Sequence, residues 1–371
     1  MNTLMQNDVS RRTFLKGVGI LGATTALGIG FPSVFIKKAI GESNDVVRLG
    51  YYDCDHMTAA PIARDAGIFE ALGLNVQVAG NGKVPEAMAA GQMDVGYIGF
   101  VGMVRAILKG SPMAAVAHNH KGGSMYMVVR KDIEKPEELI GKKLGIGAAP
   151  EKQNGWWITF ARDNGIPVEG KHYQPFAMAD RDKYLALKTG QLDAYYCCDP
   201  WGSMAEYEDT GKIMRTFSTF PSNKWGICCA QVMNRDFVKE RPKVAEKMVL
   251  AHIQALQYIY TQPVKSAEIF SKNYHVPLEV SLMTIYKKTV GETRTLRWNL
   301  EKDAYDETIA HNMDIGIFTE APKYEDIIQT QFLDQKLIPD FDTFIREKVD
   351  PVYPYGMKYE DWKKKAYDLK A

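Results

Sequence analysis

The chain has 371 residues, of which 46% are hydrophobic, and this is enough apolar material for two or three ordinary domains with cores of their own. Its formal net charge is +1 and no long run of one sign occurs, which argues against a nucleic-acid partner. Beyond the N-terminal region no stretch reaches the roughly 20 uninterrupted apolar residues of a membrane span, so any membrane link must come from the N-terminus.

The N-terminus carries the most specific short motif of the chain. Residues 10–16, SRRTFLK, match the twin-arginine export pattern, and a glycine-rich apolar run over 17–36 follows. An ordinary first helix is the alternative, but the run is interrupted by Pro32 and by several glycines. We therefore predict a signal peptide over residues 1–41 that is handled by the twin-arginine translocase, and a periplasmic or otherwise extracytoplasmic protein.

Small residues indicate where this peptide would be cleaved. Ala39 and Gly41 are of the size that a signal peptidase prefers, which places the mature start near Glu42. Cleavage near Ser33 or Val34 is the alternative. No cysteine directly follows the apolar run, so the signal does not indicate a lipid anchor.

Short strands alternate with helices through the middle of the chain. The first helix begins near Thr58 and ends at Gly73, and a later helix begins near Lys152. Such alternation is typical of an α/β fold with mainly parallel sheets and crossover helices. The predicted strands cover residues 46–51, 75–79, 95–98, 113–119, 124–129, 143–147 and 194–198.

From residue 234 onward almost every predicted element is a helix. Pro277, Pro322 and Pro339 separate the apolar-periodic stretches of this region. A helical tail that follows two α/β lobes most simply packs back on the first lobe.

One motif occurs twice in the chain, and its repetition is the basis for predicting two similar lobes. GQMD ends at Asp94 and GQLD ends at Asp193; each follows a helix, contains a glycine suited to a helix end, and leads into a short strand. The copies lie too far apart for a solenoid repeat. We expect the two aspartates to serve folding, because they sit in the turn before the strand.

The repeat predicts two α/β lobes around a cleft, with a helical C-terminal extension. The expected boundaries are 42–130 for the first part of lobe 1, 131–224 for lobe 2, and 225–371 for a return strand and the helices that pack on lobe 1. The connections between the lobes are expected near residues 128–135 and 222–232.

Five segments together resemble a known family: GIFEALGLNV, AGQMDVGYIGF, ELIGKKLGIG, GQLDAYYCCDPW and NRDFVKERPKV. In this order they are similar to the periplasmic substrate-binding proteins of ABC importers, in the nitrate, sulfonate and taurine branch that also contains the thiamine-pyrimidine-synthase relatives. The resemblance implies a type II binding fold, a small, anionic or sulfonate-like ligand, an ABC permease as partner, no cofactor and no catalysis. We expect a monomer.

Loops at the ends of strands supply the candidate ligand-binding residues, since ligands of open α/β sheets lie there. Helix N-termini near Thr58, Gly102 and Lys152 favour anionic groups. Related importers read Glu-Pro-Trp where this chain has Asp199 in place of the glutamate. The candidates are Tyr51, Cys54, Asp55, His56, Gly99, Phe100, Val101, Asn119, Ser124, Ala149, Lys152, Trp156, Cys198, Asp199, Trp201 and Cys228.

Aromatic residues cluster in the same loops, and about half of them are expected to be core. Tyr51, Trp156 and Trp201 are the predicted pocket aromatics.

All five cysteines lie at predicted strand ends or crossing segments: Cys54, Cys197, Cys198, Cys228 and Cys229. Small buried residues, or one disulfide between the lobes, explain them most simply. The alternative is a thiolate site for a soft metal, with Cys54, His56, Cys198 and Cys228 as ligands and Asp55 beside them. Adjacent cysteines alternate sides of a strand, so at most one of each pair should face the cleft.

An enzyme is the second functional hypothesis. The pyrimidine-synthase relatives carry a cysteine-rich run near the position of Cys228 and Cys229, although only two of its cysteines have counterparts here.

Overall fold

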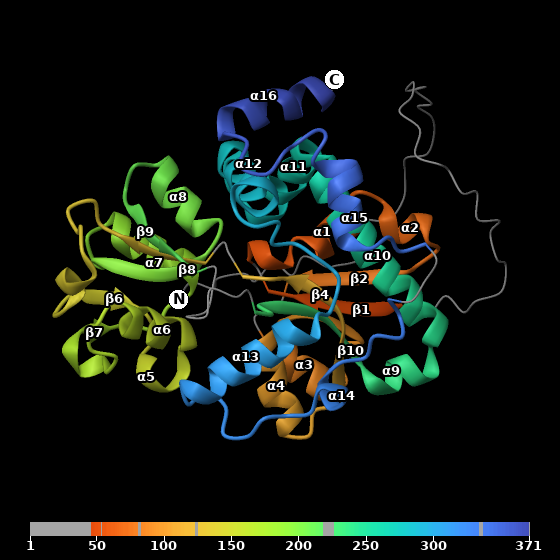
Figure 1. The fold of residues 1–371 in the computed structure, drawn as a ribbon, viewed down its shortest axis with the longest axis horizontal. Helices are drawn as coiled ribbons and strands as arrows, with labels where there is room; N and C mark the ends of the chain where they lie inside the picture. The colour runs from red at the N-terminus through yellow and green to blue at the C-terminus, as the bar shows by residue number, and fades with distance from the viewer. Residues whose placement is uncertain are drawn as a thin grey trace, which may run out of the picture. The chain divides into compact units, whose positions relative to one another are not determined.

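The computed structural model describes residues 46–52, 54–80, 83–122, 125–217, 226–333 and 337–370 (Figure 1). The predicted signal peptide over 1–41 lies outside them. Within these ranges no helix combines the length and the apolarity needed to cross a membrane.

The first lobe is built on a five-stranded sheet in the order β2-β1-β3-β10-β4. Strand β10 is antiparallel to both of its neighbours, whereas β1 is parallel to β2 and to β3. The strands are β1 (Val47–Tyr51), β2 (Val76–Gly80), β3 (Val95–Gly99), β4 (Met113–His120) and β10 (Cys229–Asn234).

The second lobe repeats this plan in the order β7-β6-β8-β5-β9, with β5 as the one reversed strand. Its strands are β5 (Met125–Val129), β6 (Lys143–Gly145), β7 (Gln174–Pro175), β8 (Ala194–Cys198) and β9 (Lys212–Thr216). The α/β class with two lobes is therefore confirmed, but each sheet is mixed. A strand that arrives directly from the other lobe needs no crossover helix and runs antiparallel to its neighbours.

The first connection between the lobes lies earlier than the sequence suggested. Strand β4 ends in one sheet at His120 and β5 begins in the other at Met125, so the expected crossing at 128–135 and the boundary at 130 are too late. All five residues of β5 are buried, and an unbroken apolar run does not reveal to which sheet it belongs. The second connection lies between Thr216 and Cys229.

The repeated motif makes the same bonds in both lobes. Gly91 and Gly190 take left-handed conformations, with φ of 67° and 73°. A carboxylate oxygen of Asp94 accepts a hydrogen bond from the Arg48 backbone N–H in β1, and Asp193 accepts one from the Lys143 N–H in β6, at 2.8 and 2.9 Å. Each motif thus pins the helix-to-strand turn to the parallel strand next to the one that it leads into.

Helices cover both sheets. In the first lobe they are η1 (Asp55–Met57), α1 (Ala59–Asp65), α2 (Ile68–Ala71), α3 (Val84–Ala89) and α4 (Phe100–Leu108). In the second they are η2 (Pro136–Leu139), α5 (Pro150–Gln153), α6 (Gly155–Asp163), η3 (Gly170–His172), α7 (Asp180–Lys188) and α8 (Trp201–Tyr207).

The C-terminal region is helical, and prolines open its long helices at Pro242 and Pro263. Its elements are α9 (Arg235–Glu240), α10 (Pro242–Thr261), α11 (Pro263–Tyr274), α12 (Leu278–Tyr286), the π-helical turn η4 (Lys287–Gly291), α13 (Lys302–Asp314), α14 (Tyr324–Ile327), α15 (Phe341–Phe344), η5 (Ile345–Val349) and α16 (Tyr359–Lys370).

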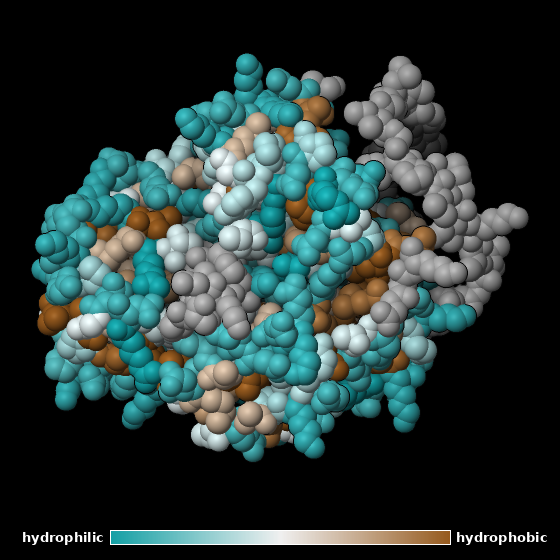
Figure 2. Space-filling model, viewed as in Figure 1, coloured by the Kyte–Doolittle hydropathy of each residue, from teal (hydrophilic) through white to brown (hydrophobic). Residues whose placement is uncertain are grey.

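These helices pack on the first lobe and also reach the second. Helices α10, α11 and α12 share one apolar core with β1 and α1, which includes Trp298 and Trp362. Toward the second lobe, Lys287 Nζ lies 2.9 Å from Glu206, and Thr159 Oγ1 lies 2.9 Å from His311 Nε2. Hydrophilic side chains cover most of α16 and of the second lobe on the face shown in Figure 2.

Candidate functional site

A cavity of about 400 Å³ is lined by residues of both lobes, a size that suits a small solute. Its walls combine the loop after β1, the start of α4, the region of α5 and α6, the end of β8, the segment that enters β10, and α13. Residues of the wall that were not among the predicted ligand-binding residues include Tyr52, Gly102, Asn154, Tyr196, Ile227, Thr308, His311 and Ile317.

Nine of the predicted site residues line this cavity: Cys54, His56, Gly99, Phe100, Val101, Ala149, Trp156, Cys198 and Cys228. They come from strand ends and helix starts in both lobes. Their contact with a ligand remains a prediction, and Ser124 lies outside the described residues.

Other predicted residues lie behind or beside the wall. Tyr51 is 6% exposed and packs in the first-lobe core, while the next residue, Tyr52, lines the cavity, because successive strand side chains point to opposite faces. Asn119 is buried and its amide donates to the His56 carbonyl at 2.5 Å. Lys152 is exposed on α5 and does not line the cavity.

Asp199 and Trp201 are not part of the cavity wall. Asp199 is fully buried; its carboxylate accepts hydrogen bonds from the Ser203 N–H and hydroxyl at 2.8 and 2.7 Å, and from the Thr284 hydroxyl at 3.1 Å. It therefore holds the start of α8 and joins it to α12. Trp201 stacks on Tyr184 with ring centroids 5.8 Å apart. The residues after β8 turn into α8 toward α12, which takes both residues away from the cavity wall, and their contact with a ligand stays a prediction.

We expect Asp199→Ala to lower the free energy of unfolding by about 3 kcal/mol, because it leaves buried donors on Ser203 and Thr284 without their acceptor. Denaturant unfolding measures this. Asp182→Ala, at an exposed position in the first turn of α7, should stay within about 0.5 kcal/mol of the unsubstituted protein. Normal stability of Asp199→Ala with lost solute binding would return Asp199 to the ligand site.

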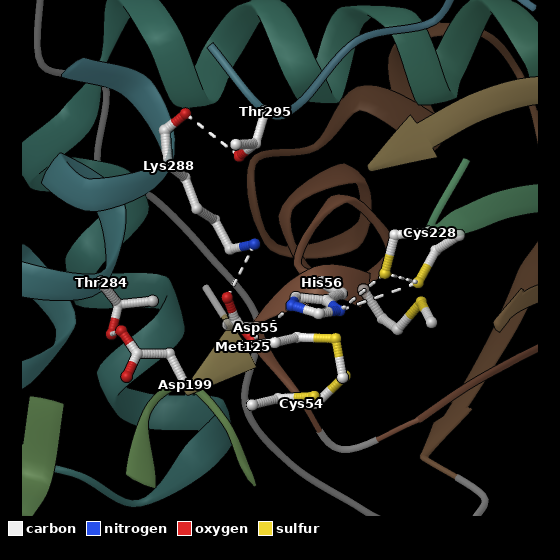
Figure 3. A network of polar contacts seen from close by, with 12 residues as sticks. Cys54, Asp55, His56, Met125, Asp199, Cys228, Thr284, Lys288 and Thr295 are labelled. Carbon is white, nitrogen blue, oxygen red and sulfur yellow. Dashed lines mark hydrogen bonds and ion pairs between the residues drawn. The ribbon is translucent and has the colours of Figure 1, made fainter. Parts of the chain in front are cut away.

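A buried ion pair lies next to His56 of the cavity wall (Figure 3). Lys288 Nζ lies 2.7 Å from Asp55 Oδ2, and both side chains are fully buried. Burial raises the pKa of Asp55 to about 6, against the charges of His56 and Lys288. Burial alone would lower the pKa of Lys288, but the Asp55 carboxylate outweighs it and raises that pKa. Each charge thus offsets part of the free-energy cost of burying the other.

Lys288 is the functional-site residue that the sequence did not reveal. It lies in η4, far along the chain from Asp55. Polar residues in such a helical stretch are normally predicted to face solvent, so its burial was not expected. The only signal is a lysine pair, Lys287 and Lys288, embedded between apolar residues.

His56 lies between this ion pair and two thiols. Its Nε2 is 3.6 Å from Asp55 Oδ1, and its Nδ1 is 3.5 Å from Cys228 Sγ and 3.8 Å from Cys229 Sγ. Its ring stacks on His120, with centroids 4.0 Å apart. Burial alone would lower the pKa of His56, but Asp55 and then Cys228 outweigh it and raise that pKa to about 10.

The two adjacent thiols differ in acidity. A hydrogen bond with Cys229 is the largest cause that holds the pKa of Cys228 well below its usual value; burial opposes it, and the His56 charge adds to it. Burial raises the pKa of Cys229, and the neighbouring Cys228 raises it further. The arrangement therefore favours a Cys228 thiolate beside a His56 imidazolium, which is a reactive or metal-binding state of cysteine.

Both Cys228 and Cys229 line the cavity, so the expectation that at most one of each pair would face it was wrong here. Cys228 precedes β10, and the register of β10 against β4 shifts between Cys229 and Ala230, which breaks the strict alternation. In the other pair the alternation holds: Cys198 lines the cavity and Cys197 is buried in the second lobe. All five cysteines are free, so no disulfide joins the lobes.

The predicted metal ligands do not form a single group. Ligand atoms of Cys54, Asp55, His56 and Cys198 lie within 4.8 Å of one another, and those of His56, Cys228 and Cys229 form a second set. His56 belongs to both. The four-residue set inferred from the sequence is thus divided between two groups that share His56.

Glu292, a glutamate at the contact between the lobes, also has a raised pKa. Tyr126 of β5 donates to Glu292 Oε1 at 3.0 Å, and burial raises the pKa of Glu292 to about 7, against the nearby Lys288 and Lys287. A carboxyl with a raised folded-state pKa stabilises the fold most below its unfolded pKa, and this contribution is lost as the pH rises through the folded pKa.

We therefore expect Glu292 to contribute up to about 3 kcal/mol of stability at pH 4.5 that is lost by about pH 7. Buried His118 and His252, whose pKa burial lowers to about 4, act in the opposite direction, so the Glu292 contribution is measured as a difference. The difference in free energy of unfolding between Glu292→Gln and the unsubstituted protein should change by this amount over the range, in denaturant titrations at a series of pH values. Curves of the same slope for both proteins would show that Glu292 titrates normally.

The class of the protein follows from the two mixed sheets with one reversed strand each. This is the type II periplasmic binding protein fold. The model of the NMT1-like family matches residues 41–271, which is more than half of the chain. The chain belongs to this family.

The chain is similar to known binding proteins in sequence and in structure. The taurine-binding periplasmic protein of Escherichia coli strain K12 is 25% identical over 197 residues, which are 51% of this chain and 59% of that protein. This chain thus spans less than two thirds of its relative. Among solved structures, the periplasmic aliphatic sulphonate binding protein of Escherichia coli has a TM-score of 0.63 at 15% identity, covering 80% of this chain and 96% of that one.

Two further structures show how broadly the fold is used. A ligand-binding component of an ABC-type import system from Staphylococcus aureus, with zinc bound, has a TM-score of 0.63 at 15% identity and covers 78% of this chain and 98% of that one. The desulfurization enzyme DSZB has a TM-score of 0.60 at 14% identity and covers 78% and 99%. Binding proteins and an enzyme therefore share this architecture.

Proposed function

We propose that the protein is the extracytoplasmic solute-binding component of an ABC importer, exported by the twin-arginine route, and that it captures a small anionic, sulfonate-like solute. The observation that carries the proposal is the cavity lined by both lobes, since a solute held there is enclosed by two rigid units. Membership of the NMT1-like family and the likeness to a taurine-binding protein support it.

The charge on the cavity wall favours an anion. Helix α4 begins at the wall, and the N–H groups of Val101 and Gly102 lie in its first turn, where the helix supplies no acceptor. Trp156 and Ile317 provide apolar contact for the rest of the solute.

Calorimetric titration with a matched panel tests the proposal: taurine, ethanesulfonate, sulfate, acetate and the cation ethylammonium. We expect at least one sulfonate to bind with a Kd of about 1 μM or tighter and without turnover. Binding of ethylammonium in preference to every anion would overturn the proposal.

Closure of the lobes is a second consequence. The contact of Thr159 with His311 joins the second lobe to α13 in this structure, and we expect it to break when the lobes open and to form again when the solute is enclosed. Small-angle scattering is expected to give a smaller radius of gyration with bound solute. Identical profiles with a solute that calorimetry shows to bind would contradict closure.

A thiol-dependent enzyme is the second candidate, and the contact of Cys228 with His56 is the observation that favours it. Mass spectrometry of the solute after incubation separates the two functions. A binding protein returns the solute unchanged, whereas an enzyme converts it and loses this activity in Cys228→Ser.

A further inference from the structure

Three ligand atoms at the cavity wall form a triangle of the size that a metal ion requires. His56 Nδ1 lies 3.5 Å from Cys228 Sγ and 3.8 Å from Cys229 Sγ, and the two sulfurs are 3.5 Å apart. In a tetrahedral zinc site with Zn–S near 2.3 Å and Zn–N near 2.0 Å, neighbouring ligand atoms lie about 3.5–3.8 Å apart. The three side chains therefore already have the spacing of one face of such a site.

The local chain geometry explains how two adjacent cysteines reach the same ion. Cys228 lies just before β10, and the irregular register after Cys229 removes the alternation that would separate their side chains. The Cys228 N–H donates to the His120 carbonyl at 3.0 Å, and the Cys228 carbonyl accepts from the Phe100 N–H at 2.8 Å. The backbone that carries the two thiols is thus held on both sides.

The surroundings of His56 resemble the outer shell of a metal-bound histidine. Such histidines usually direct their second nitrogen toward a carboxylate, which fixes the ring and increases its basicity. Here Nε2 lies 3.6 Å from Asp55 Oδ1, and Asp55 is itself held by Lys288 (Figure 3). On the other side the ring stacks on His120, which is fully buried.

All three residues line the cavity. Three protein ligands and a fourth position that opens on a cavity are the arrangement of zinc sites that bind or activate a further ligand. Thiolate and imidazole ligands select thiophilic ions such as Zn²⁺ and Cu⁺ over Mg²⁺ and Ca²⁺.

We propose that His56, Cys228 and Cys229 form a binding site for one thiophilic metal ion, with its fourth coordination position open to the cavity. This goes beyond solute capture, because enclosure of an anion by two lobes and a helix N-terminus needs no metal. Cys54 and Cys198 lie on the other side of His56, in the set that includes Asp55, and they are not ligands of this ion.

The test uses the full chain, reduced and freed of metal by a chelator, with Zn²⁺ and Co²⁺ as probes and no solute present. We expect one Zn²⁺ per chain by elemental analysis, and with Co²⁺ a thiolate-to-cobalt charge-transfer band together with the visible absorption of a tetrahedral ion. Absence of a stoichiometric ion, or a Co²⁺ spectrum without thiolate character, overturns the site.

Single substitutions assign the ligands. Cys228→Ser, Cys229→Ser and His56→Gln should each weaken Zn²⁺ binding at least about 100-fold in competition with a zinc indicator, and Asp55→Asn by about 10-fold. Cys197→Ser, in the buried part of the second lobe, is the matched control and should bind as the unsubstituted chain does. Thermal melting of the metal-free forms confirms that each variant folds.

The group formed by Cys54, Asp55, His56 and Cys198 is the competing site, and the same variants test it. Unchanged Zn²⁺ affinity in Cys229→Ser, combined with a large loss in Cys54→Ser and Cys198→Ser, would place the ion on the Asp55 side of His56 and overturn the proposal. If Cys228→Ser or Cys229→Ser fails to fold, Cys54→Ser and Cys198→Ser still decide, since the proposed site predicts unchanged Zn²⁺ affinity in both and the other set predicts a large loss.

Discussion

Lys288→Met is expected to lower the free energy of unfolding by about 3 kcal/mol, because the buried Asp55 carboxylate loses its partner at 2.7 Å and keeps only His56 at 3.6 Å. Methionine retains most of the side-chain volume, so little of the loss comes from a cavity. Denaturant unfolding of the metal-free protein measures it. The loss of free energy of unfolding should be smaller in acid than at neutral pH, because burying a neutral Asp55 carboxyl costs less free energy than burying the carboxylate.

A double variant is the control for this prediction. Asp55→Asn together with Lys288→Met removes both charges and should recover a large part of the lost stability. Lys302→Met is the control at the surface: Lys302 pairs with Asp306 where both side chains are exposed, and its removal should lower the free energy of unfolding far less than Lys288→Met does. A cost below about 1 kcal/mol for Lys288→Met would mean that water reaches Asp55 in the folded protein.

Gly102→Leu is expected to weaken solute binding more than about 100-fold while leaving the protein folded. Gly102 lies in the first turn of α4 at the cavity wall, and a Cβ added there meets no atom of the described residues within 4 Å. A leucine side chain therefore projects into open space, and it occupies room that the solute needs. Replacing glycine in a helix also raises stability, by up to about 1 kcal/mol.

Affinity and stability thus move in opposite directions, which an unfolding effect does not produce. Gly102→Ala is the matched control: it gives most of the gain in helix propensity but adds only a methyl group, so its effect on affinity should be much smaller. The measurements are thermal melting and calorimetric titration with the sulfonate that the unsubstituted protein binds most tightly. Normal affinity in Gly102→Leu would show that the solute does not occupy this cavity.

Several features of the molecule were readable from local sequence. The glycine and aspartate of each repeated motif act within one helix-to-strand turn, and the same left-handed glycine and the same carboxylate-to-backbone bond occur in both lobes. Strand ends that face a cleft follow from the order of elements, which is why Cys54, Val101 and Cys198 line the cavity as predicted.

Other features depend on which strand neighbours which. The sequence placed β5 in the first lobe because a uniformly buried strand carries no mark of its sheet, and pairing with β8 and β9 decides the question. Asp199 is a similar case. Its loop follows a strand end, but the chain turns into α8 and the carboxylate meets Thr284 of α12 instead of the cavity.

The sequence alone therefore determined the α/β class, the two lobes, the repeated turns and part of the cavity wall, since these follow from hydrophobic periodicity and from bonds between near neighbours in the chain. Only the tertiary structure brought Lys288 to Asp55, and only it turned Cys228 and Cys229 toward His56. These partners lie on segments that are distant in sequence, and nothing in the local pattern of either one specifies the other. The free energy of burying a charge is settled by what packs beside it after folding.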